Sequence, residues 1–165
     1  MIKRKIIIFG LPGSGKSYFA KRLHQITNIE LIHLDNLLCD KDTKRININH
    51  LESTLKTLLQ KEEGITEGFY HYNLEERLEW CDTCYFFDLP KEEVYEGLKA
   101  RINVKSDDCP FTRTEDELKS FENNYRSYLK EKKPLIIELL NKYNNKETIT
   151  FHSRNEVNDY IKKLL

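Results

Sequence analysis

The chain has 165 residues, which is enough for one sizeable hydrophobic core and short for two. Charged residues make up 33% of it, but 27 basic side chains balance 27 acidic ones. A net charge of zero argues against direct nucleic-acid binding, which typically shows a basic surplus. No apolar run approaches the ~20 residues of a membrane-spanning helix, so we expect a cytoplasmic protein with no membrane partner.

The first predicted element is a strand at residues 5–9, because an unbroken β-branched run is typical of a strand buried on both faces. A helix is expected over residues 17–25, and a second short strand over residues 30–34. Leucines spaced as on one helical face then predict a helix over residues 49–62.

A third strand is predicted at residues 64–67, closed by a glycine. The sequence that begins at Asn73 resembles a capping box, which predicts a short helix there. A fourth strand follows at residues 83–88. Pro90 suits the first turn of the next helix, which we expect to run to about residue 102.

The segment 103–113 breaks this alternation, because it is polar and has no clear period. We expect a lid-like loop there, followed by helices over residues 114–129 and 134–143. A fifth strand at residues 148–151 comes next, and a second capping-box pattern at Ser153 predicts the final helix.

Strands separated by helices are typical of βαβ units, in which helices cover both faces of a parallel sheet. We therefore predict an α/β fold of three layers, built as one domain over residues 1–165. Four cysteines are present, at Cys39, Cys81, Cys84 and Cys109. Although Cys81 and Cys84 have the spacing of a metal or redox pair, no second pair accompanies them, and packed free thiols are the favoured interpretation.

The sequence GLPGSGKS at residues 10–17 fits the pattern of a phosphate-binding loop, G-x-x-x-x-G-K-[ST]. It lies between a predicted buried strand and a predicted helix, whose positive end favours a polyphosphate. Lys16 places a charge near the β- and γ-phosphates, and the hydroxyl of Ser17 can bind Mg²⁺. The residues predicted to bind the nucleotide here are Gly10, Pro12, Gly13, Ser14, Gly15, Lys16, Ser17 and Tyr18.

Three carboxylates follow predicted strands, where the ligands of a parallel sheet collect. A kinase needs one carboxylate for the water shell of Mg²⁺, and it gains from another that orients or deprotonates the acceptor hydroxyl. We assign the acceptor side to Asp35, against the alternative of a helix cap, and the metal side to Glu67, through water. For Asp88, capping of the next helix is the favoured interpretation.

Two histidines lie near these acids. For His33 a buried side chain with satisfied hydrogen bonds is favoured over a catalytic one. His71 lies in the loop after the third strand, where it could face a ligand. A histidine without ligand contact is the favoured interpretation.

With these residues placed, the chain resembles the small adenylate-kinase-like P-loop kinases, and more specifically the bacterial family of DNA topology modulation proteins. The resemblance covers essentially the whole chain and rests on the runs IIIFGLPGSGKSYFAKRL, ELIHLDNL, GITEGFY, LEERLEWCDTCYFFDLP, LKARI, FENNYRSYLKEKKPLIIELLNKY and HSRNEVNDYI. It implies a five-stranded parallel sheet in the order 2-3-1-4-5, ATP and Mg²⁺ as cofactors, and a lid formed by the loop after LKARI.

The resemblance also assigns residues. Arg101 matches a lid-base arginine that reaches the phosphates, and Ser153 and Arg154 match a loop that packs near the adenine. Tyr70 and Arg77 fall on the acceptor side. The expected catalytic set is therefore Lys16, Asp35, Glu67 and Arg101.

The chain departs from the family pattern at two positions. Glu67 stands where an aspartate is usual, and Tyr72 stands where an arginine is frequent. Phosphate-bearing acceptors are typically clamped by a bidentate arginine. Because Tyr72 stands at that position, the identity of the acceptor stays open. The sequence predicts a kinase that passes the γ-phosphoryl group of ATP to a nucleotide or another small molecule. The alternative is a nucleotide-dependent regulatory or binding ATPase, for example one linked to DNA topology.

Overall fold

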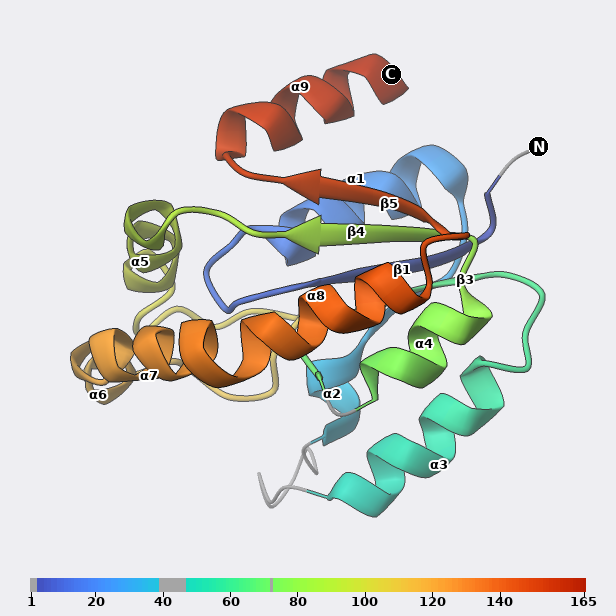
Figure 1. Cartoon of the computed structure of the whole chain (residues 1–165). Coiled ribbons are helices and arrows are strands. Elements are labelled where there is room, and N and C mark those ends of the chain that lie inside the picture. Colours follow the sequence, from blue (N-terminus) through green and yellow to red (C-terminus); the bar gives the residue numbers. More distant parts are fainter. Residues whose placement is uncertain (1–2, 39–46, 72) are drawn as a thin grey trace.

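The computed structural model describes residues 3–38, 47–71 and 73–165. Its centre is a parallel sheet in the order β2-β3-β1-β4-β5 (Figure 1), which confirms the predicted α/β fold and strand order. The strands are β1 (Lys5–Gly10), β2 (Leu31–His33), β3 (Gly64–Glu67), β4 (Thr83–Phe87) and β5 (Glu147–Phe151). None of the helices described here combines the length and the apolar character needed to cross a bilayer.

One face of the sheet is covered by α1 (Lys16–Thr27) and α9 (Arg154–Leu164), which lie side by side above the strands in Figure 1. Successive residues of β1 point to opposite faces, so Ile6 and Ile8 pack against Phe19 of α1 and the apolar side of α9. This double burial explains why β1 is apolar without interruption.

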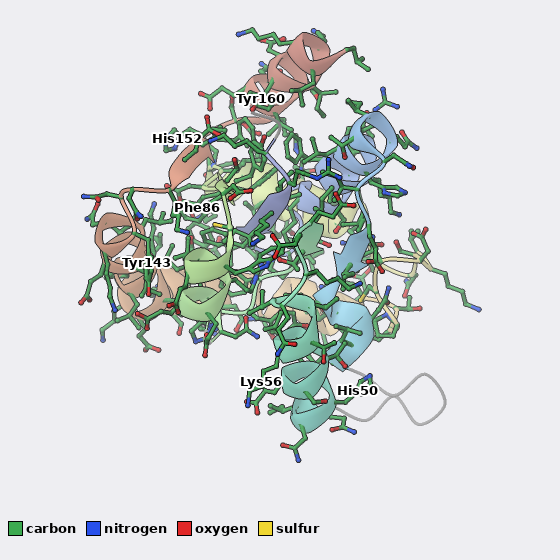
Figure 2. The ribbon with its side chains drawn as sticks, turned by 90° about the vertical axis from the view of Figure 1, so that its right-hand side faces the viewer. His50, Lys56, Phe86, Tyr143, His152 and Tyr160 are labelled. Atoms are coloured by element: carbon green, nitrogen blue, oxygen red, sulfur yellow. The ribbon has the colours of Figure 1, made fainter. Side chains whose placement is uncertain are left out.

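The other face is covered by α4 (Leu74–Trp80) and α8 (Lys133–Lys142). Ile7 and Phe9 of β1 point to this side, where the ring of Phe9 stacks on Phe86 with their centroids 4.8 Å apart. Figure 2 labels one residue in each layer: Tyr160 in α9, Phe86 in the sheet and Tyr143 at the end of α8. Phe86 lies between the other two.

In the part of the β2–β3 connection that the structure describes, there are two helices. The second strand ends one residue earlier than predicted, and α2 (Leu34–Leu38) begins directly after it. Its Leu34 packs with Leu51 and Leu55 of α3 (Ile48–Leu58), which is shorter than the helix predicted from the leucine spacing. This small cluster fixes α2 at the carboxyl end of β2.

The region after β4 contains α5 (Lys91–Lys99), α6 (Glu115–Lys119) and α7 (Phe121–Ser127). The helix predicted over residues 114–129 is thus two short helices. A π-helical turn, η1 (Tyr128–Lys132), then joins α7 directly to α8, although the two were predicted as separate helices. Pro134 has no N–H to donate to the carbonyl four residues earlier, so the regular helical ladder cannot form there.

Two of the predicted caps do not form. The side chain of Asn73 makes no cap hydrogen bond and is buried without a partner among the described residues. The cap of α5 is Pro90, while the carboxylate of Asp88 pairs with the ammonium of Lys133 at 2.8 Å. The cap at Ser153 is confirmed, since its hydroxyl accepts a hydrogen bond from the N–H of Glu156 at 3.2 Å.

The cysteines that the structure describes are free and buried. Burial raises the pKa of Cys81 to about 11 and raises that of Cys84 well above its usual value, so both thiols stay protonated at neutral pH. Cys39 lies outside the described residues. The interpretation as packed thiols therefore holds for Cys81, Cys84 and Cys109.

Candidate active site

The predicted phosphate-binding loop connects β1 to α1 at the carboxyl end of the sheet. Gly13 and Gly15 have φ angles of 88° and 91°, in the left-handed region that glycine enters without a steric penalty. A Cβ on Gly13 would lie 2.4 Å from the carbonyl oxygen of Val94 and 2.6 Å from the nitrogen of Leu98. The loop therefore needs glycine for its backbone shape and also for direct contact with α5.

Gly97 of α5 completes this contact from the other side. A Cβ there would lie only 1.9 Å from the carbonyl oxygen of Gly13. Arg154 links the same elements, because its guanidinium donates hydrogen bonds of 2.9 Å to the carbonyls of Gly13 and Glu93. Sequence reasoning missed Gly97, although an isolated glycine inside a predicted helix is a signal of close packing.

Glu67 is the best-partnered acid of the site. Its side chain is 4% exposed, and Oε1 lies 3.4 Å from Nζ of Lys16. The hydroxyl of Ser17 also hydrogen-bonds to it. Burial raises the pKa of Glu67, but the charge of Lys16 and the hydrogen bonds from His33 and Ser17 outweigh burial and lower it to about 2. The carboxylate is therefore ionised at neutral pH.

His33 is the third partner of Glu67. The two residues stand opposite each other on β2 and β3, and Nδ1 of His33 lies 2.7 Å from Oε2 of Glu67. The prediction of a hydrogen-bonded histidine is thus correct for His33, but it missed that the partner is a predicted site acid. The pairing depends on the register of two strands, which no local pattern contains.

Asp35 and Tyr70, both predicted for the acceptor side, lie together. The hydroxyl of Tyr70 donates a hydrogen bond to Oδ1 of Asp35, which stands in the first turn of α2. A Cβ on Gly68 would lie 3.0 Å from both Leu34 and the ring of Tyr70, so the chain after β3 runs tightly against α2.

Arg77 does not join this group. It is 0% exposed, and its guanidinium donates to the carbonyls of Gly68 and Ile8 at 3.3 and 3.4 Å. Burial lowers the pKa of Arg77 to about 10, which still leaves it charged at neutral pH. The expectation that Arg77 contacts the acceptor is corrected, since the side chain has no exposed surface and instead supports the ends of β1 and β3. Tyr72 lies outside the described residues.

The segment 103–113 bridges three elements around the loop. Asp107 pairs with Lys21 of α1, and its carbonyl accepts a hydrogen bond of 2.9 Å from the side chain of Asn36 in α2. Asp108 is buried and lies 3.1 and 3.2 Å, by its two oxygens, from Nη2 of Arg101. Arg101 thus faces the loop but is neutralised by a carboxylate.

These elements enclose a cleft of about 340 Å³. Its walls are the loop, the end of α5, the segment 103–113 and the start of α9, and its lining includes Gly13, Lys16, Ser17, Tyr18, Arg101, Asp108 and Arg154. Tyr18 is 59% exposed at its edge. Ser153 caps α9 beside the cleft, and Pro12 lies toward a smaller cavity of about 150 Å³ under α6 and α7.

The donor set fits a nucleotide with Mg²⁺ better than a protein-only metal site. Within residues 3–38, 47–71 and 73–165, no group of three or more histidines, cysteines or acids could hold a metal ion. Magnesium usually takes one or two protein oxygens and completes its shell with water and substrate phosphates. Ser17 and Glu67, placed next to the loop, are such a donor pair.

Comparisons with known proteins agree with this architecture. The chain is similar to the solved structure of a shikimate kinase from Acinetobacter baumannii in complex with shikimate, with a TM-score of 0.64. The match covers 98% of this chain and 90% of that one, at 15% sequence identity. No family model and no curated protein matches the chain. The likeness shows a fold shared with that kinase, while the resemblance to adenylate-kinase-like P-loop kinases and to DNA topology modulation proteins stays a prediction.

Proposed function

We propose that this chain is an ATP-dependent phosphotransferase that passes the γ-phosphoryl group to a small acceptor with a hydroxyl group. The observation that carries the proposal is the buried, ionised carboxylate of Glu67 between Lys16, Ser17 and His33. An ionised carboxylate beside a lysine and a serine hydroxyl can hold the water shell of a nucleotide-bound Mg²⁺. The fold shared with a kinase supports the same conclusion.

On the nucleotide side, the backbone N–H groups of the loop cradle the phosphates, and Lys16 adds its charge to the β- and γ-oxygens. Ser17 and Glu67 would hold Mg²⁺, the glutamate through water. Bound Mg²⁺ supplies charge neutralisation of the phosphate oxygens. Arg154 keeps the carbonyl of Gly13 turned away from the phosphates, which leaves the loop amides free to bind them.

On the acceptor side, Asp35 orients the hydroxyl and accepts its proton. The hydrogen bond from the hydroxyl of Tyr70 fixes the orientation of the Asp35 carboxylate. Both residues stand at the carboxyl ends of neighbouring strands, which directs the acceptor toward the phosphate loop. Catalysis then rests on positioning and on charge stabilisation, as is general for phosphoryl transfer.

The segment 103–113 acts as a lid in this proposal. Its contacts with α1 and α2 come from Asp107, and its contact with Arg101 comes from Asp108. A triphosphate in the cleft competes with Asp108 for Arg101, which then moves to the transferring phosphoryl group. Closure over the cleft excludes water and so favours transfer over hydrolysis.

The test is an acceptor panel. ADP release is measured with nucleosides, nucleoside monophosphates, small alcohols and hydroxy acids, each against ATP and Mg²⁺ alone. We expect at least one acceptor to raise ADP release well above hydrolysis, and Lys16→Ala to abolish the increase with the fold retained. If no acceptor raises turnover, the regulatory ATPase becomes the better description and the kinase proposal fails.

A further inference from the structure

The two carboxylate oxygens of Glu67 have different partners. Oε2 lies 2.7 Å from Nδ1 of His33, while Oε1 lies 3.4 Å from Nζ of Lys16. The side chain of Glu67 is 4% exposed, so it depends on protein groups for its hydrogen bonds. Because His33 occupies Oε2, the oxygen that stays beside the lysine of the phosphate loop is Oε1.

The length of the Glu67 side chain makes the contact with His33 important. Glu67 stands where the resembled family usually has aspartate, and a glutamate has one more rotatable bond. A longer side chain loses more rotamer freedom when it is fixed, so its carboxylate needs an additional contact to keep one position. His33 provides this contact from the neighbouring strand, since the two residues stand opposite each other in the register of β2 and β3.

The imidazole of His33 is carried by a well-anchored part of the backbone. His33 is the last residue of β2, and the next residue, Leu34, begins α2 and is 0% exposed. Leu34 packs with Leu51 and Leu55 of α3. The side chain of His33 is itself only 12% exposed. A group on a packed strand end fixes its partner more precisely than a group on a loop.

The contact also defines which nitrogen of the imidazole carries a proton. Glu67 is ionised at neutral pH, and an ionised carboxylate only accepts hydrogen bonds. Nδ1 of His33 therefore carries the proton and donates it to Oε2 of Glu67. The state of the second ring nitrogen does not affect this hydrogen bond.

We propose that His33 is a positioning residue of the phosphotransferase, whose Nδ1–H holds Oε2 of Glu67 so that Oε1 stays beside Lys16, where it would hold a water of Mg²⁺. The inference rests on the proposed function and adds to it a residue that acts through Glu67, without contact to ATP or the acceptor. Removing a partner that orients a metal-binding group typically costs about 10- to 100-fold in metal affinity or activity.

The first test needs neither ATP nor turnover. Long-range proton–nitrogen correlation spectra of the ligand-free protein at neutral pH distinguish a protonated from an unprotonated ring nitrogen. The signals of His33 are identified by their loss in His33→Asn. We expect Nδ1 of His33 to be protonated in the wild type. An unprotonated Nδ1 would show that His33 does not donate to Glu67 in solution, and it would overturn the proposal.

The second test compares His33→Asn with His33→Gln. The amide nitrogen of asparagine is as many bonds from Cα as Nδ1 of histidine, whereas that of glutamine is one bond further. We expect His33→Gln to lower kcat about tenfold and His33→Asn to lower it less than about threefold, with KM for ATP within about twofold of the wild type in both. His50→Gln, on the exposed surface of α3, is the matched control and leaves kcat unchanged. Equal values of kcat in the two His33 variants would overturn the proposal, because a role in packing alone does not distinguish the two amides.

A binding measurement separates this inference from the kinase proposal. The affinity for a non-hydrolysable analogue of ATP is measured by calorimetry with Mg²⁺ and with EDTA, and the ratio of the two affinities is the gain from the metal. We expect His33→Gln to reduce this gain about threefold and His33→Asn to keep it, with the affinity in EDTA unchanged in both. If this order appears but no acceptor is phosphorylated, the role of His33 stands and the kinase proposal fails. If the gain is the same in the wild type and in His33→Gln, the role of His33 is overturned.

Discussion

The phosphate loop and the proposed acceptor side are built in different ways. The loop is shaped by backbone contacts: glycines at positive φ, an α5 glycine pressed against it and the guanidinium of Arg154 on its carbonyl. The proposed acceptor side rests on a side-chain pair between separate elements, Asp35 with Tyr70. Under the proposed function, the phosphates that many proteins bind would meet mainly backbone amides, while the acceptor would meet side chains that can change independently.

The largest expected effect comes from Glu67→Gln, which tests the phosphate side. Turnover should fall about 10²- to 10³-fold, because a neutral amide stabilises the magnesium water shell poorly. ATP affinity should change only a few-fold, since the loop amides and Lys16 remain. Steady-state kinetics and calorimetric ATP binding measure the two quantities, with Glu79→Gln on the exposed side of α4 as control. Unchanged turnover would remove Glu67 from the metal role.

The same acid predicts a pH dependence of stability. Its pKa falls from 4.5 to about 2 on folding, so its stabilising contribution is present above pH 4.5 and is lost as the pH falls toward 2. The difference in unfolding free energy between wild type and Glu67→Gln should shrink by about 3 kcal/mol over this range. Urea unfolding at a series of pH values measures it. A difference that stays constant with pH would show that Glu67 is not ionised in the native state.

Gly97→Ala tests whether the loop depends on its contact with α5. Alanine in a helix interior normally stabilises by roughly 0.5–1 kcal/mol relative to glycine. Here the new methyl group would lie 1.9 Å from the carbonyl of Gly13, so the sign should reverse. We expect a loss of about 1–3 kcal/mol in unfolding free energy and weaker ATP binding. Gly64→Ala is the control, since its nearest atom would be 3.5 Å away. Stabilisation by Gly97→Ala would contradict the packing argument.

Asp108→Asn should have the smallest effect of the four changes. It tests whether the pairing of Asp108 with Arg101 in the segment 103–113 limits ATP affinity. Removing the carboxylate frees Arg101 from an internal competitor, so ATP affinity should rise by a factor of about 2–10. Asp116→Asn, on the exposed surface of α6, should leave ATP affinity unchanged. Calorimetric titration with ATP measures the affinity of both variants and of the wild type. A weaker ATP affinity in Asp108→Asn would mean that Asp108 supports the open cleft instead of competing for Arg101.

Much of this architecture could be predicted from the sequence, because strand burial and the loop motif are local signals. The apolar run of β1, the glycines of the loop and the position of Glu67 at a strand end all follow from short patterns. The assignments that failed depend on distant partners. Asp88 looks like a cap, yet Lys133 lies within reach, and Arg77 looks like a ligand, yet it is buried under two strand ends. The pairing of His33 with Glu67 likewise needs the register of β2 on β3.

The hydrogen bond from Arg154 to Gly13 joins residues 141 positions apart in the chain. Every residue of the phosphate loop is synthesised early, but its supporting guanidinium emerges from the ribosome only after β5 has been made. A nascent chain that lacks Arg154 therefore carries the full loop sequence without this support. Under the proposed function, ATP binding during synthesis would wait until the sheet is complete, and the nucleotide would stabilise finished molecules in preference to partial ones.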